Sequence, residues 1–150
     1  MILGFYPHFQ TKIETGTKIH TIREDKTNRW KKGNIIHFAT GVRTKSYNCF
    51  KIGKCVSIQE IEIKYFEGYK YPRICIYTTT ETSIKNGWGL FPFYFFYDDD
   101  DWRGEQEKKH HKVLLDLLAK NDGFDTFDDF CKWFNADFEG KIIHWTDFSY

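Results

Sequence analysis

Short segments that mix β-branched and aromatic residues with polar ones recur through the first half of the chain, and glycines separate most of them. This pattern is typical of half-buried β-strands joined by tight turns. It predicts strands at Ile2–Tyr6, Ile19–Arg23, Asn34–Thr40, Tyr47–Ile52, Cys55–Tyr65 and Arg73–Thr80. A last alternating segment, Lys141–Tyr150, predicts a strand that joins them.

Apolar residues at helical spacing predict helices in three other places. The first helix, His8–Thr15, is expected to end at Gly16, because glycine readily adopts the left-handed conformation that closes a helix. The longest, Glu105–Lys120, carries a stripe of valine and leucine side chains. The third is expected to begin after Thr126, a predicted N-cap, with Asp129 completing a capping box.

A chain of 150 residues has the size of one domain and is long enough to bury a core. No internal repeat or linker divides it, so a single domain over residues 1–150 is predicted. The short strands favour a small, mostly antiparallel β-barrel with flanking helices, which is an α+β fold. An aromatic insert at about residues 83–103 interrupts the pattern, and its aspartate run Asp98–Asp101 is interpreted as a solvated turn.

Composition adds two expectations to this picture. Aromatic residues make up 19% of the chain, so the core should be built largely from rings, some of which can offer stacking surfaces. The net charge is only +1, yet Met1–Lys54 is strongly basic and Tyr97–Tyr150 is strongly acidic. Either the two halves pair across the fold, or the basic half attracts phosphate while the acidic half supplies a catalytic carboxylate.

The chain shows no sign of secretion or membrane insertion. No apolar run is long enough to span a bilayer and no signal peptide is recognised, so no membrane partner is predicted. The four cysteines (Cys49, Cys55, Cys75 and Cys131) include no CxxC pair. This spacing does not favour a zinc site, and reduced thiols in a cytoplasmic protein are predicted instead. We predict neither a metal site nor a cofactor.

The segment most suited to chemistry is Gly16–Arg23, which places an ammonium, an imidazole, a hydroxyl and a guanidinium close together. In an extended segment the side chains alternate between faces, so Lys18 and His20 point one way and Thr21 points the other. Lys18, Thr21 and Arg23 converge only if the backbone bends between Lys18 and Thr21. Without that bend, the segment is a basic, solvated strand edge.

Three patches of the sequence resemble the ASCH domain family of the PUA-like superfamily. The first, Ile13–Arg23, matches the family's G-x-K-x-x-T-x-R run. The second, Trp30–Phe38, is similar to a family segment in which a glycine and an aspartate precede a strand, here with Asn34 in place of the aspartate. The third, Leu118–Phe130, is like the helix-DGF-helix unit that precedes the last strand.

The resemblance implies a PUA-like β-barrel with a cleft lined by the lysine, threonine and arginine of the first patch. Family members are associated with RNA or nucleotide-like ligands. One branch resembles small amidohydrolases that remove the acetyl group from 4-N-acetylcytidine with a lysine, a threonine and an acidic residue. Carried over by position, these catalytic residues are Lys18, Thr21 and Asp122, where an aspartate replaces the family's glutamate.

Three functions therefore remain open. The first is binding of RNA or a nucleoside- or nucleotide-like ligand, with contacts from Gly16, Lys18, His20, Thr21, Arg23 and Trp30. The second is hydrolysis of an acylated nucleoside, which requires that Lys18 lose its proton and act as a base. The third is a structural or interaction role, in which Arg23 pairs with Asp122 or Asp147 to tie the first strands to the last.

The hydrolase interpretation depends on two opposing influences on Lys18. Burial, or the neighbouring Arg23, would lower the pKa of Lys18, whereas an adjacent Asp122 would raise it. The sequence leaves the balance between these effects open.

Overall fold

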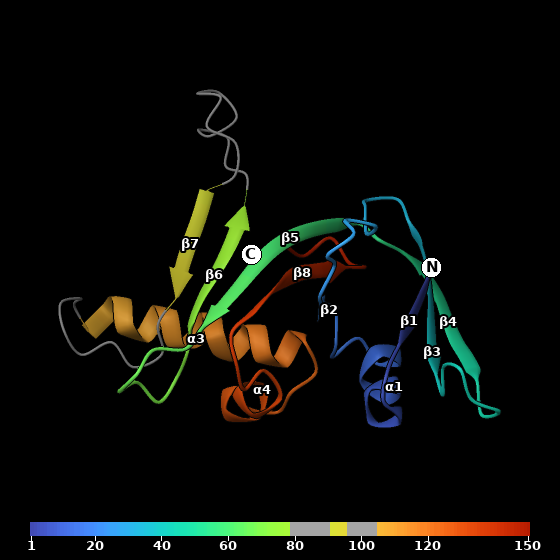
Figure 1. Cartoon of the computed structure of the whole chain (residues 1–150), viewed down its shortest axis with the longest axis horizontal. Coiled ribbons are helices and arrows are strands. Elements are labelled where there is room, and N and C mark those ends of the chain that lie inside the picture. The colour runs from blue at the N-terminus through green and yellow to red at the C-terminus, as the bar shows by residue number, and fades with distance from the viewer. Residues whose placement is uncertain (79–90, 96–104) are drawn as a thin grey trace.

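The computed structural model describes residues 1–78, 91–95 and 105–150 of the chain (Figure 1). Within them the strands are β1 (Ile2–Gly4), β2 (His20–Arg23), β3 (Ile35–Thr40), β4 (Asn48–Lys54), β5 (Ser57–Lys64), β6 (Arg73–Thr78), β7 (Phe91–Phe95) and β8 (Phe138–His144). The helices are α1 (Pro7–Glu14), α3 (Glu105–Asn121) and α4 (Phe127–Trp133). This is the α+β fold that the sequence predicts. No helix in the described part of the chain is long and apolar enough to cross a membrane.

Local signals define the helix ends. Pro7 begins α1, where its missing N–H costs nothing, and Gly16 follows the helix with a φ of 76°. Thr126 caps α4, since its hydroxyl accepts a hydrogen bond from the backbone N–H of Asp129 at 3.1 Å. Both the predicted stop and the predicted cap are confirmed.

The described strands form two sheets, with the orders β1-β3-β4 and β2-β8-β5-β6-β7. β1 runs parallel to β3, and the other described pairs are antiparallel. The chain passes from one sheet to the other between β4 and β5, where Cys55 N donates to Asn34 O and Val56 N donates to His144 O, each at 2.8 Å. Figure 1 shows the first sheet and α1 at one end of the molecule and α3 beside the second sheet at the other.

Each sheet has its own apolar core. In the first, rings mix with aliphatic side chains, and the buried members are Leu3, Phe5, Phe9, Ile13, Trp30, Ile36, Phe38, Cys55 and Ile143. In the second, isoleucines of the sheet pack on α3 and α4, with Ile22, Ile61, Ile63, Ile74, Ile76, Ile142, Leu115, Leu118, Ala119, Phe127, Phe130 and Phe134 buried. The half-buried ring of Phe124, between α3 and α4, packs against both cores and so joins them.

The predicted closed barrel is not found among the described residues. β8 pairs with β5 as expected, but β3 belongs to the other sheet, so these three strands do not share one sheet. The separation begins at Cys55 and Val56, because Cys55 N donates to Asn34, just before β3, and Val56 N donates to His144, at the end of β8.

The prediction of a terminal strand over Lys141–Tyr150 is wrong in its bounds, because β8 begins at Phe138 and ends at His144. After β8 the ring of Trp145 packs on Phe38, with ring centroids 4.9 Å apart, and the chain leaves the ladder. Of the predicted aromatic insert, Phe91–Phe95 forms β7 beside β6. The remainder, including the aspartate run, lies outside the described residues.

Candidate functional site

The centre of the candidate site is a contact between the segment that follows α1 and the segment that follows α3. The Lys18 Nζ lies 2.6 Å from Asp122 Oδ1, and it also donates to the backbone carbonyl of Asp122. The turn at Gly16 directs the chain so that Lys18 N donates to Lys12 O at 2.8 Å. The lysine therefore reaches the carboxyl end of α3, where the helix dipole favours a cation.

Asp122 also holds the open edge of β2. Its Oδ1 accepts a hydrogen bond from Ile22 N at 3.2 Å, and the preceding residue, Asn121, accepts one from Ile19 N at 2.9 Å. His20 Nδ1 lies 3.6 Å from the same carboxylate oxygen. One aspartate thus faces an ammonium, an imidazole and a backbone N–H, all contributed by residues 18–22.

Burial decides the protonation of this cluster. Lys18 is 2% exposed and Asp122 is 3% exposed, and the Lys18 Nζ lies 4.9 Å from the centre of the Phe9 ring. Burial lowers the pKa of Lys18 to about 8; Asp122 acts in the opposite direction but does not offset it, while Arg23 and Lys12 lower it further. The balance that the sequence leaves open therefore falls on the side of a lowered pKa, and Lys18 loses its proton above about pH 8.

The pKa of Asp122 itself lies below its ordinary value. Burial raises that pKa, but the facing Lys18 and His20 more than compensate. The pKa of His20 is lowered, chiefly by burial, so this imidazole is neutral near neutral pH.

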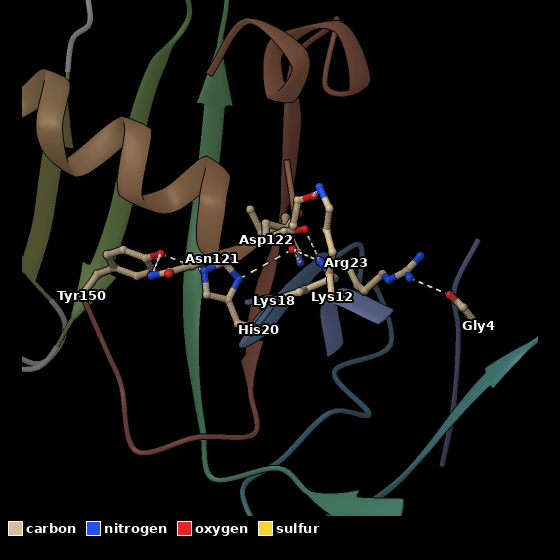
Figure 2. Close-up of polar contacts among 10 residues, drawn as sticks. Gly4, Lys12, Lys18, His20, Arg23, Asn121, Asp122 and Tyr150 are labelled. Atoms are coloured by element: carbon tan, nitrogen blue, oxygen red, sulfur yellow. Dashed lines mark hydrogen bonds and ion pairs between the residues drawn. The ribbon is translucent and has the colours of Figure 1, made fainter. Parts of the chain in front are cut away.

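Behind His20 the polar contacts continue to Tyr150. The Tyr150 hydroxyl lies 2.7 Å from His20 Nε2 and accepts a hydrogen bond from Asn121 Nδ2 at 3.0 Å. Gln59 holds the backbone of Tyr150 in both directions: its Nε2 donates to Tyr150 O, and its Oε1 accepts from Tyr150 N, each at 2.9 Å. Figure 2 shows the groups in a row, from Tyr150 through His20 and Asp122 to Arg23 and Gly4.

The same region holds a second buried histidine. The rings of His144 and His20 lie 5.3 Å apart at their centroids, and they come from directly opposed positions on β8 and β2. Neither ring nitrogen of His144 has a hydrogen-bond partner within the described structure. Burial, with a smaller contribution from His20, lowers the pKa of His144 to about 3.

Three further residues that the sequence predicts for the site, Thr21, Gly16 and Trp30, lie in different surroundings from one another. Thr21 is 3% exposed and lies on β2 opposite Ile143. Gly16 is exposed, with nothing within 4 Å of the position that a Cβ would take. Trp30, proposed as a stacking ring, is 2% exposed inside the first core, so its ring faces other side chains rather than solvent.

Arg23 does not make the aspartate pair that the structural interpretation requires. Its Nη2 donates to Gly4 O at 2.6 Å, its guanidinium lies 5.3 Å from the centre of the Phe5 ring, and its buried Nε has no partner in the described structure. Arg23 therefore ties β2 to the first sheet rather than to Asp122 or Asp147.

Several residues of the site escape sequence reasoning. Gly123 has a φ of 91°, and a Cβ there would lie 2.9 Å from Lys18 Cδ and from the Phe9 ring. Its conformation is what allows Lys18 to lie against the turn, and the Asp-Gly-Phe triplet is the signal that points to it. Gln59, Asn121, His144 and Tyr150 carry no such signal, because their contacts are long-range.

A groove of about 660 Å³ lies elsewhere, on the second sheet, and includes none of the Lys18, His20 and Asp122 group. Its lining is mainly charged and includes Glu24, Asp25, Glu60, Glu62 and Lys64. In the described part of the chain, no group of three or more His, Cys, Asp or Glu side chains is arranged to hold a metal ion.

Comparisons with models of protein families, with curated proteins and with solved structures found no match to this chain.

Proposed function

We propose that this protein is a small amidohydrolase that removes the acyl group from a modified nucleoside such as 4-N-acetylcytidine. The observation that carries the proposal is the buried Lys18, whose pKa of about 8 lies close to neutrality while Asp122 fixes its Nζ at 2.6 Å. A general base is most effective when its pKa lies near the working pH, and a solvated lysine does not meet that condition. The resemblance of Ile13–Arg23 to the ASCH family supplies the substrate class.

The roles follow from the chemistry of amide hydrolysis. Neutral Lys18 takes the proton of the Thr21 hydroxyl, and the oxygen attacks the acyl carbon to give an ester on the enzyme. The lysine then returns the proton to the departing cytosine amine, and water hydrolyses the ester. Asp122 positions Lys18 through the ion pair and is a positioning residue in this scheme.

Binding of RNA through the same residues has less support. A phosphate would have to replace Asp122 as the partner of the Lys18 ammonium, whereas the hydrolase uses the Lys18–Asp122 contact as it stands. Arg23 donates to Gly4 O. An RNA surface would have to use cations outside this cluster, such as Lys26 and Arg29, whose side chains are 80% and 65% exposed.

The ASCH family assignment, a PUA-like barrel and a cytoplasmic location belong to the same proposal. The family and the barrel rest on the three sequence patches. The location rests on the free thiols of Cys49, Cys55, Cys75 and Cys131, which are typical of a reducing compartment.

The test is turnover of 4-N-acetylcytidine, followed by chromatographic separation of cytidine from substrate. Thr21→Val and Lys18→Met should each lower kcat/KM by about 100-fold or more, since each removes a group that acts on the reacting atoms. Thr27→Val and Lys120→Met are matched controls at exposed positions and should retain wild-type turnover.

Wild-type activity in Thr21→Val would contradict the proposed nucleophile. If the wild-type protein does not turn over the nucleoside, a filter-binding titration with short RNA separates the alternatives. RNA affinity that falls with salt, and that is weakened by Arg29→Ala, would support the RNA function instead.

A further inference from the structure

Tyr150 is bound by neighbouring side chains at its hydroxyl and at its backbone, as a ligand would be. Its hydroxyl is bound by His20 and Asn121, and its backbone N–H and carbonyl are both bound by the Gln59 amide. Its ring lies 5.5 Å from the His20 ring and 6.2 Å from the His144 ring, measured between centroids. Gln59, Asn121, His20 and His144 are all buried polar residues, and they form the polar side of a pocket around the Tyr150 ring. The apolar side consists of the second core and of Phe148, whose ring centroid lies 4.9 Å from that of Tyr150.

This pocket has more hydrogen-bonding capacity than Tyr150 uses. His144 is 0% exposed, yet both of its ring nitrogens lack a partner within the described structure. Buried polar atoms in proteins are nearly always paired, because an unpaired one loses its hydration without compensation. A phenol offers one polar atom to the pocket, whereas a nucleobase of similar ring size offers several along its edge.

The pocket continues the Lys18–Asp122 site. His20 is shared between them, with Nε2 at 2.7 Å from the Tyr150 hydroxyl and Nδ1 at 3.6 Å from Asp122. Lys18 and Asp122 are covered, so a substrate must displace something to reach them. Tyr150 is only half-buried and belongs to a segment without regular structure after β8, with exposed neighbours at Asp147 and Ser149.

We propose that the Tyr150 pocket is the base-binding subsite of the proposed hydrolase, and that Tyr150 is a built-in occupant which a pyrimidine base displaces. Asn121, His20 and His144 then bind the polar edge of the base. A pyrimidine matches the phenol ring in size and a purine does not, so the subsite selects pyrimidine nucleosides. This inference rests on the proposed function and names the residues that select its substrate.

The experiment is a calorimetric titration with cytidine, the non-hydrolysable product. Tyr150→Ala should bind cytidine at least about tenfold more tightly than the wild type, because the ligand no longer competes with the chain's own ring. Tyr150→Phe should lie between them, since it keeps the ring but loses the contacts with His20 and Asn121. Adding Asn121→Ala to Tyr150→Ala should weaken binding again. Tyr69→Ala, at an exposed tyrosine, is the control and should bind as the wild type does.

Cytidine affinity in Tyr150→Ala that equals or falls below the wild-type value overturns the inference, as does adenosine binding as tight as cytidine binding. If Tyr150→Ala does not fold, Tyr150→Phe and Gln59→Ala test the same displacement. Gln59→Ala frees the Tyr150 backbone and should also tighten cytidine binding. Unchanged affinity in both variants overturns the inference.

Turnover of 4-N-acetylcytidine is measured separately, so the two proposals fail in different ways. If Tyr150→Ala binds cytidine more tightly but the wild type does not turn over 4-N-acetylcytidine, the subsite is supported and the hydrolase proposal is contradicted. Turnover by the wild type with unchanged cytidine affinity in Tyr150→Ala keeps the hydrolase and defeats the subsite.

Discussion

The Lys18 ammonium and the Asp122 carboxylate lie 2.6 Å apart although 104 residues separate them in sequence. Their side chains are 2% and 5% exposed, so the pair is buried on both sides. A second contact of this kind joins Lys12 of the basic half to Asp125 of the acidic half, whereas the Lys141–Asp25 pair joins the two halves with the charges reversed. Of these contacts, the Lys18–Asp122 pair is the most deeply buried, so its removal should change the free energy of unfolding most.

Lys18→Met should lower the free energy of unfolding by about 3–5 kcal/mol, because it leaves a buried carboxylate without its partner. Urea denaturation measures this change. The double variant Lys18→Met with Asp122→Leu should recover much of the loss, since it removes the second charge as well. A double variant that is as unstable as the sum of the single ones would contradict the coupling. Lys120→Met, at an exposed position of α3, is the control and should change stability by less than about 0.5 kcal/mol.

The stability of the wild type should rise with pH between 8 and 10.5 relative to Lys18→Met. The pKa of Lys18 is 10.5 in the unfolded chain and about 8 in the folded protein, so across this window the unfolded chain binds the extra proton. The free energy of unfolding then increases by on the order of 1 kcal/mol per pH unit. Below pH 8 both states carry the proton and the difference between the variants should level off. A constant difference across the window would show that Lys18 keeps its ordinary pKa.

In the proposed hydrolase, kcat/KM should rise with pH through an apparent pKa near 8, because only neutral Lys18 accepts the proton of Thr21. Asp122→Asn should move this midpoint to lower pH, since the carboxylate raises the pKa of Lys18. The measurement is the pH profile of 4-N-acetylcytidine turnover. A midpoint that does not move in Asp122→Asn would assign the titration to another group.

Acid should destabilise the protein through His144. Its pKa falls from 6.5 in the unfolded chain to about 3 in the folded protein, and the pKa of the adjacent His20 is lowered as well. As the pH decreases from 6.5 the unfolded chain gains protons that the folded protein does not, so the free energy of unfolding decreases. His144→Leu should show a shallower decrease in urea denaturation over the same range. An equal slope in the two proteins would count against a neutral, buried His144.

Gly123→Ala should cost more stability than Gly16→Ala, although both glycines have a positive φ. Alanine in the left-handed region costs about 1–2 kcal/mol at either position. At Gly123 the added Cβ also meets Lys18 Cδ and the Phe9 ring at 2.9 Å, whereas at Gly16 it meets nothing within 4 Å. Thermal unfolding of the two variants measures the difference, and equal losses would mean that the Lys18 side chain adapts freely.

The parts of the structure with local signals could be predicted from the sequence. Thr126 caps its helix through Asp129 N, a contact three residues away, and Gly16 closes α1 in the conformation that glycine favours. The proximity of Lys18 and Asp122 followed from charge and from the family resemblance rather than from any local pattern. The sequence does not predict the pKa values of Lys18 and Asp122, because these depend on burial, which is a property of the folded chain.

The wrong or missing predictions have the same cause, because they concern contacts between residues that are far apart in the sequence. Aromatic alternation in Trp145–Tyr150 looks like a strand, but these rings pack on other elements and Tyr150 bonds to the Gln59 side chain instead of to a neighbouring strand. The division into two sheets depends on the acceptors of two backbone N–H groups, those of Cys55 and Val56. No residue spacing in the sequence encodes these acceptors. His144 was missed because a lone histidine in an apolar strand carries no pattern.

The position of β2 also sets an order of events during synthesis. β2 lies at the edge of its sheet, and its strand partner among the described residues is β8, which begins at Phe138. At about 5–20 residues per second, on the order of ten seconds pass between translation of His20 and translation of that partner. During this interval Ile22 has no strand against which to be buried, and we expect the basic residues Lys18 and Arg23 on either side of it to oppose aggregation of the nascent chain.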